Sequence, residues 1–365
     1  MSSPKVFKIA LIGCGRISFK HIDAFISWQD KISLVALVDI DPQHLSLCFE
    51  HYNHQFSQHT ERPSRPPLQY SSIQSLLDAY REEKIDLDLV VLATPSGLHP
   101  QQSILCAESG LNVLTEKPMA TCWSDGLRMI DAFDRAKKKL FVVKQNRFNP
   151  TIQLVKDVIS KNELGRIHMV SCNVFWSRPQ SYYDSADWRG TWEFDGGALM
   201  NQASHYVDLL AWLIGPVDSV QAITATQERQ IEVEDSAVLN IKWRNGALGS
   251  MSVTMLTYDA NLEGSLTVLG SRGSIRVGGK ALNKIDMWNL SSSIFSSKDA
   301  EASSYSMDSV YGNGHKELYH SILLDLEDRE PTHCNGRSGL KSLELLIASY
   351  KSAKNQVTVS LPLDF

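Results

Sequence analysis

The chain has 365 residues, 43% hydrophobic and 21% charged, values typical of a globular protein of about two domains. Its 36 Lys and Arg against 41 Asp and Glu give a net charge of −5, which excludes a global positive field for holding nucleic acid. No apolar run approaches the roughly 20 residues of a membrane span, and Ile9–Ile12 is too short for a signal-peptide core. Six scattered cysteines form no C-x-x-C pair, so we expect reduced thiols, a cytoplasmic location and no metal site.

The first third of the chain alternates short hydrophobic runs with helical patterns, as parallel βαβ units do. Strands are predicted over Val6–Ile12, Ile32–Asp39, Leu87–Ala93, Leu111–Thr115 and Leu140–Val143. Helices are predicted after the first strand, from Pro42, and over His99–Glu108 and Ser124–Lys138. The polar, proline-rich stretch His51–Ser72 is expected to be an exposed loop. The histidines of this region are expected to face solvent: His21, His44, His51, His54 and His59. Together these patterns predict a dinucleotide-binding domain over residues 1–149.

The pattern changes after Asn149, and residues 150–365 are assigned to a second domain for substrate binding and oligomerisation. A strand at Ile167–Trp176 and a helix through His205–Leu213 are followed by a meander of strands: Val217–Gln227, Ser236–Trp243, Ala247–Met255, Ser265–Leu269 and Ser274–Val277. Asn245-Gly246 is a type I′ hairpin signal. The Ser-rich stretch Ser291–Ser309 is expected to be a flexible excursion before two helices, Lys316–Leu326 and Leu340–Ser352.

A glycine-rich turn after the first strand carries the clearest chemical signal. Gly13-Cys14-Gly15-Arg16-Ile17-Ser18 opens a helix, and Asp39 ends the next strand. In this context Gly13 permits a tight turn, Gly15 lets the backbone approach a pyrophosphate, and Asp39 accepts hydrogen bonds from ribose hydroxyls. The alternative is a tight turn in a nucleotide-free domain, which the strand, helix and spaced acid together disfavour. Asp39 would repel a 2′-phosphate and no Arg or Lys follows at once, so NAD is favoured over NADP.

Two more segments follow predicted parallel strands at their carboxyl ends, where open sheets bind ligands. Thr94-Pro95-Ser96 follows the third strand, and Glu116-Lys117-Pro118 follows the fourth. A lone strand-end lysine is usually only solvated, so Lys117 depends on its neighbours for a functional assignment. The expected cofactor-binding residues are Gly13, Gly15, Arg16, Ile17, Asp39, Thr94, Pro95, Ser96, His99, Glu116 and Lys117.

The Glu116-Lys117-Pro118 motif resembles the hallmark of the Gfo/Idh/MocA oxidoreductase family, whose members carry an active-site Lys there. A second resemblance lies in Asp195–Asp208, where the family has a D-x-x-x-H pair on one face of one helix. His205 matches the His, and Asn201 replaces the Asp. Because Asn cannot take a proton, the resemblance implies that His205 is the base and that Lys117 polarises the reacting oxygen. It also implies the fold class: an N-terminal Rossmann domain and a C-terminal α/β domain with an open, mostly antiparallel sheet.

Longer strings resemble the branch of this family that oxidises UDP-N-acetylglucosaminuronic acid at C3. They are 144–150, 187–206 and 309–315. This resemblance implies a UDP-sugar acid substrate, a ketone for a following aminotransferase, and a place in surface polysaccharide (O-antigen, lipopolysaccharide) synthesis. The implied substrate-binding residues are Lys117, Arg147, Asn149, Arg178, Arg189, Asn201, Gln202, His205 and Tyr311. The arginines suit a carboxylate and a diphosphate, although each alone is more often part of a surface ion pair.

Three alternative functions stay open at this point. The chain could oxidise a free cyclitol or aldose, act as a non-catalytic NAD-binding regulator, or be a glycosidase that uses NAD without net NADH formation. The Lys117 and His205 pair argues against the regulator and only weakly against the others. An open sheet with one exposed face must be covered, and members of the family often form tetramers through this face. We therefore expect a symmetric oligomer, a homotetramer.

Overall fold

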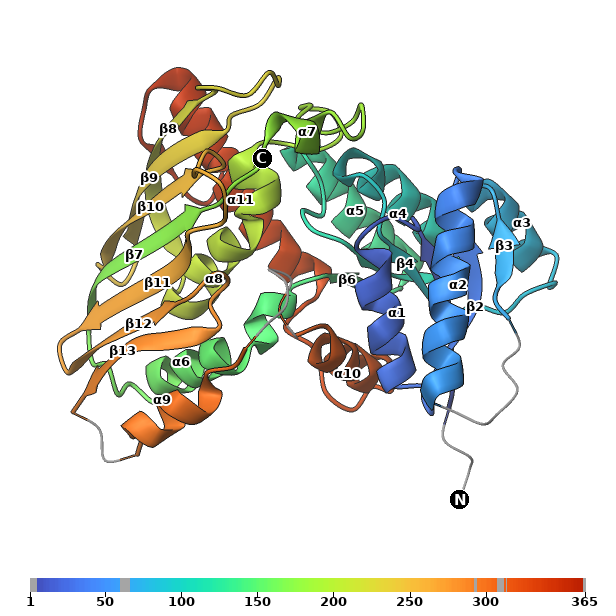
Figure 1. The fold of residues 1–365 in the computed structure, drawn as a ribbon, viewed down its shortest axis with the longest axis horizontal. Helices are drawn as coiled ribbons and strands as arrows, with labels where there is room; N and C mark the ends of the chain where they lie inside the picture. Colours follow the sequence, from blue (N-terminus) through green and yellow to red (C-terminus); the bar gives the residue numbers. More distant parts are fainter. Residues whose placement is uncertain (1–4, 60–65, 292–293, 307–311, 313, 364–365) are drawn as a thin grey trace. The chain divides into compact units, whose positions relative to one another are not determined.

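The computed structural model describes residues 5–59, 66–291, 294–306, 312 and 314–363 (Figure 1). The chain forms two compact units. Unit 1 comprises Met1–Val143 and His315–Leu340, and unit 2 comprises Lys144–Gly314 and Lys341–Phe365. Among the described residues, none of the helices combines the length and the hydropathy that crossing a membrane requires.

Unit 1 is built on a six-stranded parallel sheet with the order β3-β2-β1-β4-β5-β6. Its strands are β1 (Phe7–Ile12), β2 (Ile32–Val38), β3 (Leu68–Tyr70), β4 (Leu89–Leu92), β5 (Asn112–Thr115) and β6 (Leu140–Val142). Its helices are α1 (Ser18–Ser27), α2 (Pro42–His59), α3 (Ile73–Arg81), α4 (His99–Glu108), α5 (Trp123–Ala136) and α10 (His315–Leu326), with a short turn η1 (Ser96–Leu98). The central strands are buried on both faces, which explains their continuous apolar sequences. This is the predicted dinucleotide-binding arrangement.

Three predictions for unit 1 differ from the structure. The expected loop His51–Ser72 is helical to His59 and contains β3. Tyr52 lies one turn after Cys48 and both are buried, so the buried face of α2 continues into this segment. The unpredicted helix α3 is preceded by Ser72, which caps it: the Ser72 hydroxyl accepts the Ser75 backbone N–H at 3.1 Å. The segment 315–340, assigned from the sequence to the second domain, belongs to unit 1, where Tyr319 of α10 packs edge-on against Phe25 of α1.

Unit 2 contains an eight-stranded sheet with the order β13-β12-β11-β7-β10-β9-β8-β14. Its strands are β7 (Ile167–Phe175), β8 (Val217–Ala225), β9 (Ser236–Trp243), β10 (Leu248–Thr254), β11 (Glu263–Gly270), β12 (Gly273–Gly278), β13 (Lys284–Leu290) and β14 (Val359–Ser360). The helices and turns are η2 (Gln145–Phe148), α6 (Pro150–Ser160), α7 (Gln180–Tyr183), η3 (Ala198–Gln202), α8 (Ser204–Ile214), α9 (Ser297–Ser303) and α11 (Gly336–Asn355), the last beginning in unit 1. Neighbouring strands are antiparallel except β7 and β10, so the expected mostly antiparallel sheet is confirmed.

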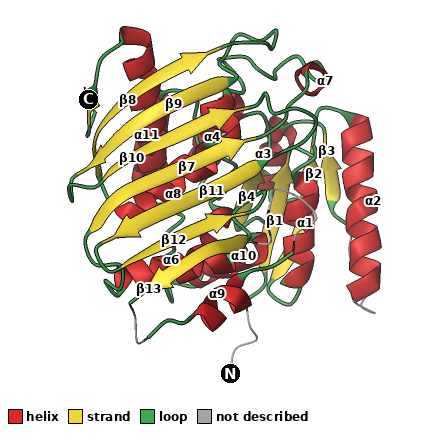
Figure 2. Ribbon diagram, turned by 60° about the vertical axis from the view of Figure 1, so that its left-hand side comes forward, coloured by secondary structure: helices red, strands yellow, loops and turns green. Residues whose placement is uncertain are grey.

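Helices α6, α8 and α11 cover one face of this sheet, as Figure 2 shows. The other face carries exposed apolar side chains, among them Ile223, Val238 and Leu248.

The expected excursion 291–309 contains a helix, α9, whose first turn is closed by a reciprocal Ser296 and Asp299 capping box. At the predicted Asn245-Gly246 hairpin only Gly246 has a positive φ (+88°), so the turn is not type I′, which needs two such residues.

Candidate active site

The glycine-rich turn of unit 1 has the geometry of a dinucleotide cradle. Gly13 has a φ of +93°, and a Cβ there would lie 2.5 Å from the Ala93 carbonyl oxygen. A Cβ on Gly15 would meet nothing within 4 Å, which leaves the approach to its backbone open. Asp39 is held in place because its carboxylate accepts the N–H groups of Cys14 at 2.6 Å and Asp41 at 2.9 Å. Ser18, at the third position of the motif, is buried and donates to the Gly15 carbonyl at 2.6 Å. These residues therefore fit an adenine dinucleotide.

Glu116 of the Glu-Lys-Pro motif points into unit 1. One oxygen accepts the Lys117 backbone N–H at 3.0 Å, and the other lies 3.3 Å from His21 Nε2. Burial raises the pKa of Glu116, but the hydrogen bond and charge of His21, with Lys117 and His315, hold it well below its usual value. His21 was expected to face solvent; it is fully buried and its Nδ1 is 2.8 Å from the Tyr319 hydroxyl. The carboxylate of Glu116 therefore fixes the backbone of Lys117 from inside the unit.

His99 joins the two strand-end segments. Its Nδ1 lies 2.9 Å from the Pro118 carbonyl oxygen, and its Nε2 lies 2.9 Å from the Thr94 carbonyl oxygen. Burial lowers the pKa of His99 against the opposing effect of the two carbonyls. His99 is only 1% exposed, and both of its ring nitrogens lie at hydrogen-bond distance from backbone carbonyls, so its side chain ties these loops together.

Arg147, expected to bind substrate, is instead buried in an ion-pair cluster of unit 2. Its guanidinium donates to Asp208 at 2.7 and 2.6 Å, while Lys144 Nζ lies 3.2 Å from the same carboxylate and Ser342 donates to it at 2.5 Å. Burial raises the pKa of Asp208, but the charges of Arg147 and Lys144, with the hydrogen bonds from Arg147 and Ser342, together hold it well below its usual value. Asp208 and Lys144 were not predicted as partners of Arg147, although Lys144 lies in the segment 144–150 and Asp208 ends the segment Asp195–Asp208. The cluster ties η2 to α8, the helix that contains His205.

His205 and Asn201 do not share one helix, contrary to the expectation. Asn201 lies in the π-helical turn η3, and His205 follows in α8. The Ala203 N–H donates to the Ala198 carbonyl, five residues earlier, so the turn holds one residue more than an α-helical turn. The extra residue changes the angular position of Asn201 relative to His205. His205 Nε2 lies 3.0 Å from Gln145 Nε2, and Asn201 donates to Asp195. Both side chains are half-buried.

Arg178, Arg189 and Gln202 meet around the hydroxyl of Tyr182. Arg189 donates to this hydroxyl at 2.7 Å and Gln202 donates to it at 3.0 Å. Arg178 Nε donates to Gln202 Oε1 at 3.0 Å. Both guanidinium groups also lie over the Tyr182 ring, at 5.5 and 4.4 Å from its centre. Unit 2 therefore brings two cations and an amide together in one cluster.

Asn149 lies at the start of α6 and is buried, yet neither polar atom of its amide has a hydrogen-bond partner among the described residues. Tyr311 lies outside the described residues. Lys117 and the cofactor residues belong to unit 1, whereas Asn201 and His205 belong to unit 2.

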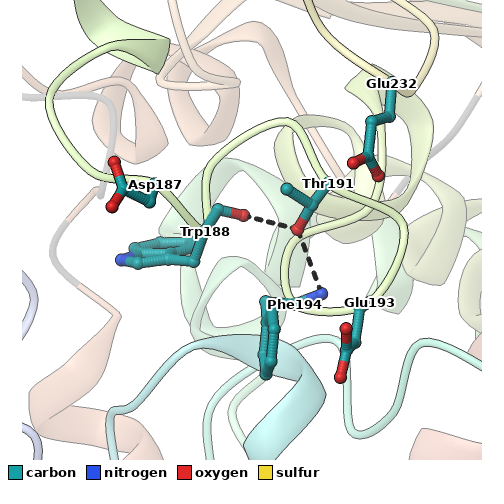
Figure 3. A pocket seen from close by; sticks show the side chains of 6 residues that line it. All are labelled: Asp187, Trp188, Thr191, Glu193, Phe194 and Glu232. Carbon is teal, nitrogen blue, oxygen red and sulfur yellow. Dashed lines mark hydrogen bonds between the residues drawn. The ribbon is translucent and has the colours of Figure 1, made fainter.

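A pocket of about 350 Å³ in unit 2 is lined by Asp187, Trp188, Thr191, Glu193, Phe194 and Glu232 (Figure 3). Thr191 shapes it by donating to the Trp188 carbonyl and accepting the Phe194 N–H. Three carboxylates line the pocket, so it would repel an anionic substrate. No group of three or more metal-ligating side chains occurs in the part of the chain that the structure describes.

Comparison with known proteins places this architecture in a family. Residues 7–144 match the NAD-binding Rossmann fold of an oxidoreductase family, and residues 156–361 match its C-terminal α/β domain. The WlbA dehydrogenase of Chromobacterium violaceum, whose structure contains NADH and UDP-GlcNAcA, is 50% identical with a TM-score of 0.90, over 100% of this chain and 98% of that one. The WlbA dehydrogenase of Bordetella pertussis, also with NADH and UDP-GlcNAcA, is 48% identical with a TM-score of 0.91, over the whole of both chains.

A levoglucosan dehydrogenase of Pseudarthrobacter phenanthrenivorans is 27% identical, over 52% of this chain and about half (55%) of its own length. The dinucleotide cradle, the Glu-Lys-Pro motif and both matched domains lead to one assignment. The chain belongs to the Gfo/Idh/MocA oxidoreductase family.

Proposed function

We propose that this protein uses NAD to oxidise the C3 hydroxyl of a UDP-N-acetylglucosaminuronic acid to a ketone. The observation that carries the proposal is the 48–50% identity, over the full chain, to two dehydrogenases whose structures contain NADH and UDP-GlcNAcA. The cradle around Gly13 and Gly15 would hold the pyrophosphate, and Asp39 the adenosine ribose. When bound there, NAD accepts the hydride that leaves the oxidised carbon. Thr94, Pro95, Ser96 and Lys117 would complete this site at the ends of β4 and β5.

The anionic groups of such a substrate need cationic donors, which the Tyr182 cluster supplies. Arg178 and Arg189 offer planar guanidinium groups that suit a carboxylate or a diphosphate, and Gln202 adds an amide. Asn149 offers a desolvated amide whose donors and acceptor have no partner in the described residues. Arg147 is left out of this proposal because Asp208 occupies its guanidinium.

His205 would take the proton of the C3 hydroxyl, since its side chain is half-buried and Gln145 fixes the orientation of its ring. Lys117 would stabilise the negative charge that develops on the C3 oxygen. Asn201 is held by Asp195 and can donate or accept a hydrogen bond but cannot take the proton.

We further propose that the uncovered face of the unit 2 sheet pairs with a second copy of the chain in a symmetric oligomer, a tetramer as the family resemblance implies. The exposed apolar side chains of β8, β9 and β10 support this assignment. The product would be a ketone, the class of compound that an aminotransferase consumes. The family resemblance implies that the protein is located in the cytoplasm and takes part in the synthesis of a surface polysaccharide.

The test is the initial rate of NADH formation with UDP-GlcNAcA, UDP-GlcNAc and myo-inositol. We expect turnover with UDP-GlcNAcA and a rate at least tenfold lower with UDP-GlcNAc, which lacks the carboxylate that the arginines would bind. Faster oxidation of myo-inositol would instead indicate a cyclitol dehydrogenase. Absence of NADH in a single turnover with all three compounds would indicate a regulator, and release of an aglycone without net NADH would indicate a glycosidase.

A further inference from the structure

The π-helical turn η3, which carries Asn201 and Gln202, has no capping side chain of its own. Gly197 precedes it and has no side chain, and η3 does not follow a Ser, Thr, Asp or Asn. The first N–H groups of a helical turn need acceptors, and here they are buried. Their acceptors come from two residues that are distant in sequence.

Glu234 and Tyr350 satisfy three consecutive N–H groups of this turn. Ala198 N–H donates to the Glu234 carbonyl at 2.9 Å, and Leu199 N–H donates to Glu234 Oε1 at 2.8 Å. Met200 N–H donates to the Tyr350 hydroxyl at 3.1 Å, and this hydroxyl donates in turn to Glu234 Oε1 at 2.8 Å. The result is one connected network that replaces a local cap.

The Glu234 carboxyl packs directly against the backbone of Gly197. A Cβ on Gly197 would overlap the carboxyl group, so the glycine is required for this close approach. The side chain is 3% exposed, and its Oε2 has no hydrogen-bond partner among the described residues. Burial, with a smaller contribution from Asp235, raises the pKa of Glu234 to about 7, and the Leu199 N–H and Tyr350 hydroxyl oppose this increase. Burying a carboxyl group costs free energy, and the hydrogen bonds from the Leu199 N–H and the Tyr350 hydroxyl offset part of this cost.

We infer that Glu234 and Tyr350 are positioning residues that hold η3 by capping it from outside, and thereby place Asn201 and Gln202 for the substrate. The kinetic part of this inference rests on the proposed function. The network belongs to unit 2, whereas the proposed cofactor residues belong to unit 1. Its loss should therefore change the arrangement of the substrate side chains and leave NAD binding as it is.

The test compares four variants by amide hydrogen exchange and by steady-state kinetics. Tyr350→Phe removes the acceptor of the Met200 N–H, and Glu234→Met removes the acceptor of the Leu199 N–H. Glu234→Gln retains a carbonyl oxygen at this position. Ser352→Ala is the matched control, because its buried hydroxyl on the same helix also accepts a backbone N–H, that of Ala222 at 2.9 Å, away from η3.

We expect the amides of peptide 197–203 to exchange at least about tenfold faster in Tyr350→Phe and Glu234→Met, the effect of losing one buried hydrogen bond. The kcat with UDP-GlcNAcA should fall about tenfold or more in both, since small displacements of positioned groups are costly, while KM for NAD stays unchanged. Glu234→Gln should restore most of the protection and of kcat. Ser352→Ala should leave both as in the wild type.

Unchanged exchange in Tyr350→Phe and Glu234→Met would overturn the inference, and so would faster exchange with an unaltered kcat. Equal loss of kcat in Ser352→Ala would also overturn it, because the effect would then be general destabilisation. If the wild type does not oxidise UDP-GlcNAcA, the proposed function fails, and the exchange data alone decide whether Glu234 and Tyr350 hold η3.

Discussion

Replacing Asp208 by Asn should destabilise unit 2 strongly. Asp208 is 1% exposed and is the carboxylate that faces both Arg147 and Lys144 in the buried cluster. Asp208→Asn removes the negative charge and leaves two cations about as buried as before. Removing one partner of a buried ion pair costs about 3–5 kcal/mol, and the 1% exposure leaves little solvent screening to reduce this value. We expect a loss of that size in the free energy of unfolding.

The assay is urea unfolding followed by tryptophan fluorescence, since Trp212 lies 5.2 Å from the Arg147 guanidinium and reports on this cluster. Ser342→Ala is the control, because it removes a neutral donor to the same oxygen and should cost only about 1 kcal/mol. A loss below about 1 kcal/mol in Asp208→Asn would refute the reasoning. So would an Arg147→Met variant that unfolds like the wild type but has a raised KM for UDP-GlcNAcA, because Arg147 would then be a substrate ligand.

The other predictions concern cofactor choice, catalysis and acid stability. Asp39→Ala with Ile40→Arg should shift preference toward NADP, measured as the ratio of kcat/KM values; equal use of both cofactors by the wild type would contradict the role of Asp39. Lys117→Met should lower kcat by about two orders of magnitude with the circular dichroism spectrum unchanged, and an unaltered rate would rule Lys117 out. His205→Asn should lower kcat by about 10² to 10⁴, the cost of losing a general base, whereas Asn201→Asp should have a milder effect; an unaltered kcat in His205→Asn would rule His205 out as the base. Burial and the charge of His21 lower the pKa of His315 to about 3 in the folded protein. As pH falls, His315 is therefore protonated in the unfolded chain before it is protonated in the folded protein, and the free energy of unfolding decreases from about pH 6.5 toward pH 3. His315→Leu should reduce this loss in urea unfolding at pH 7 and pH 5, and an unchanged pH dependence would show that His315 is not its source.

Local signals in the sequence predicted much of the fold. Continuous apolar runs identified the buried parallel strands, and strict alternation identified β9, because these patterns reflect burial on two faces or on one. The helix predicted around His99 to Glu108 is confirmed, and Pro100 lies in its first turn. The edge strand β3 was missed because only three residues pair and most of them are exposed.

Side chains whose environment depends on distant partners could not be assigned correctly. His21 is buried because Tyr319, 298 residues away, supplies a hydrogen bond that the sequence pattern does not reveal. Arg147 is buried with its guanidinium donating to Asp208, 61 residues away, a partner that the sequence pattern does not reveal. Glu234 and Tyr350 lie 116 residues apart and carry no motif. Long-range ion pairs and caps of this kind are decided by tertiary packing.

The most direct test of the proposed reaction is a single turnover with UDP-GlcNAcA carrying deuterium at C3. The account predicts that the deuterium is transferred to NAD, so the nucleotide recovered from the protein gains the mass of one deuterium and the sugar becomes a 3-ketone. NADH that contains no deuterium, or a sugar that keeps its deuterium at C3, would contradict oxidation at this carbon.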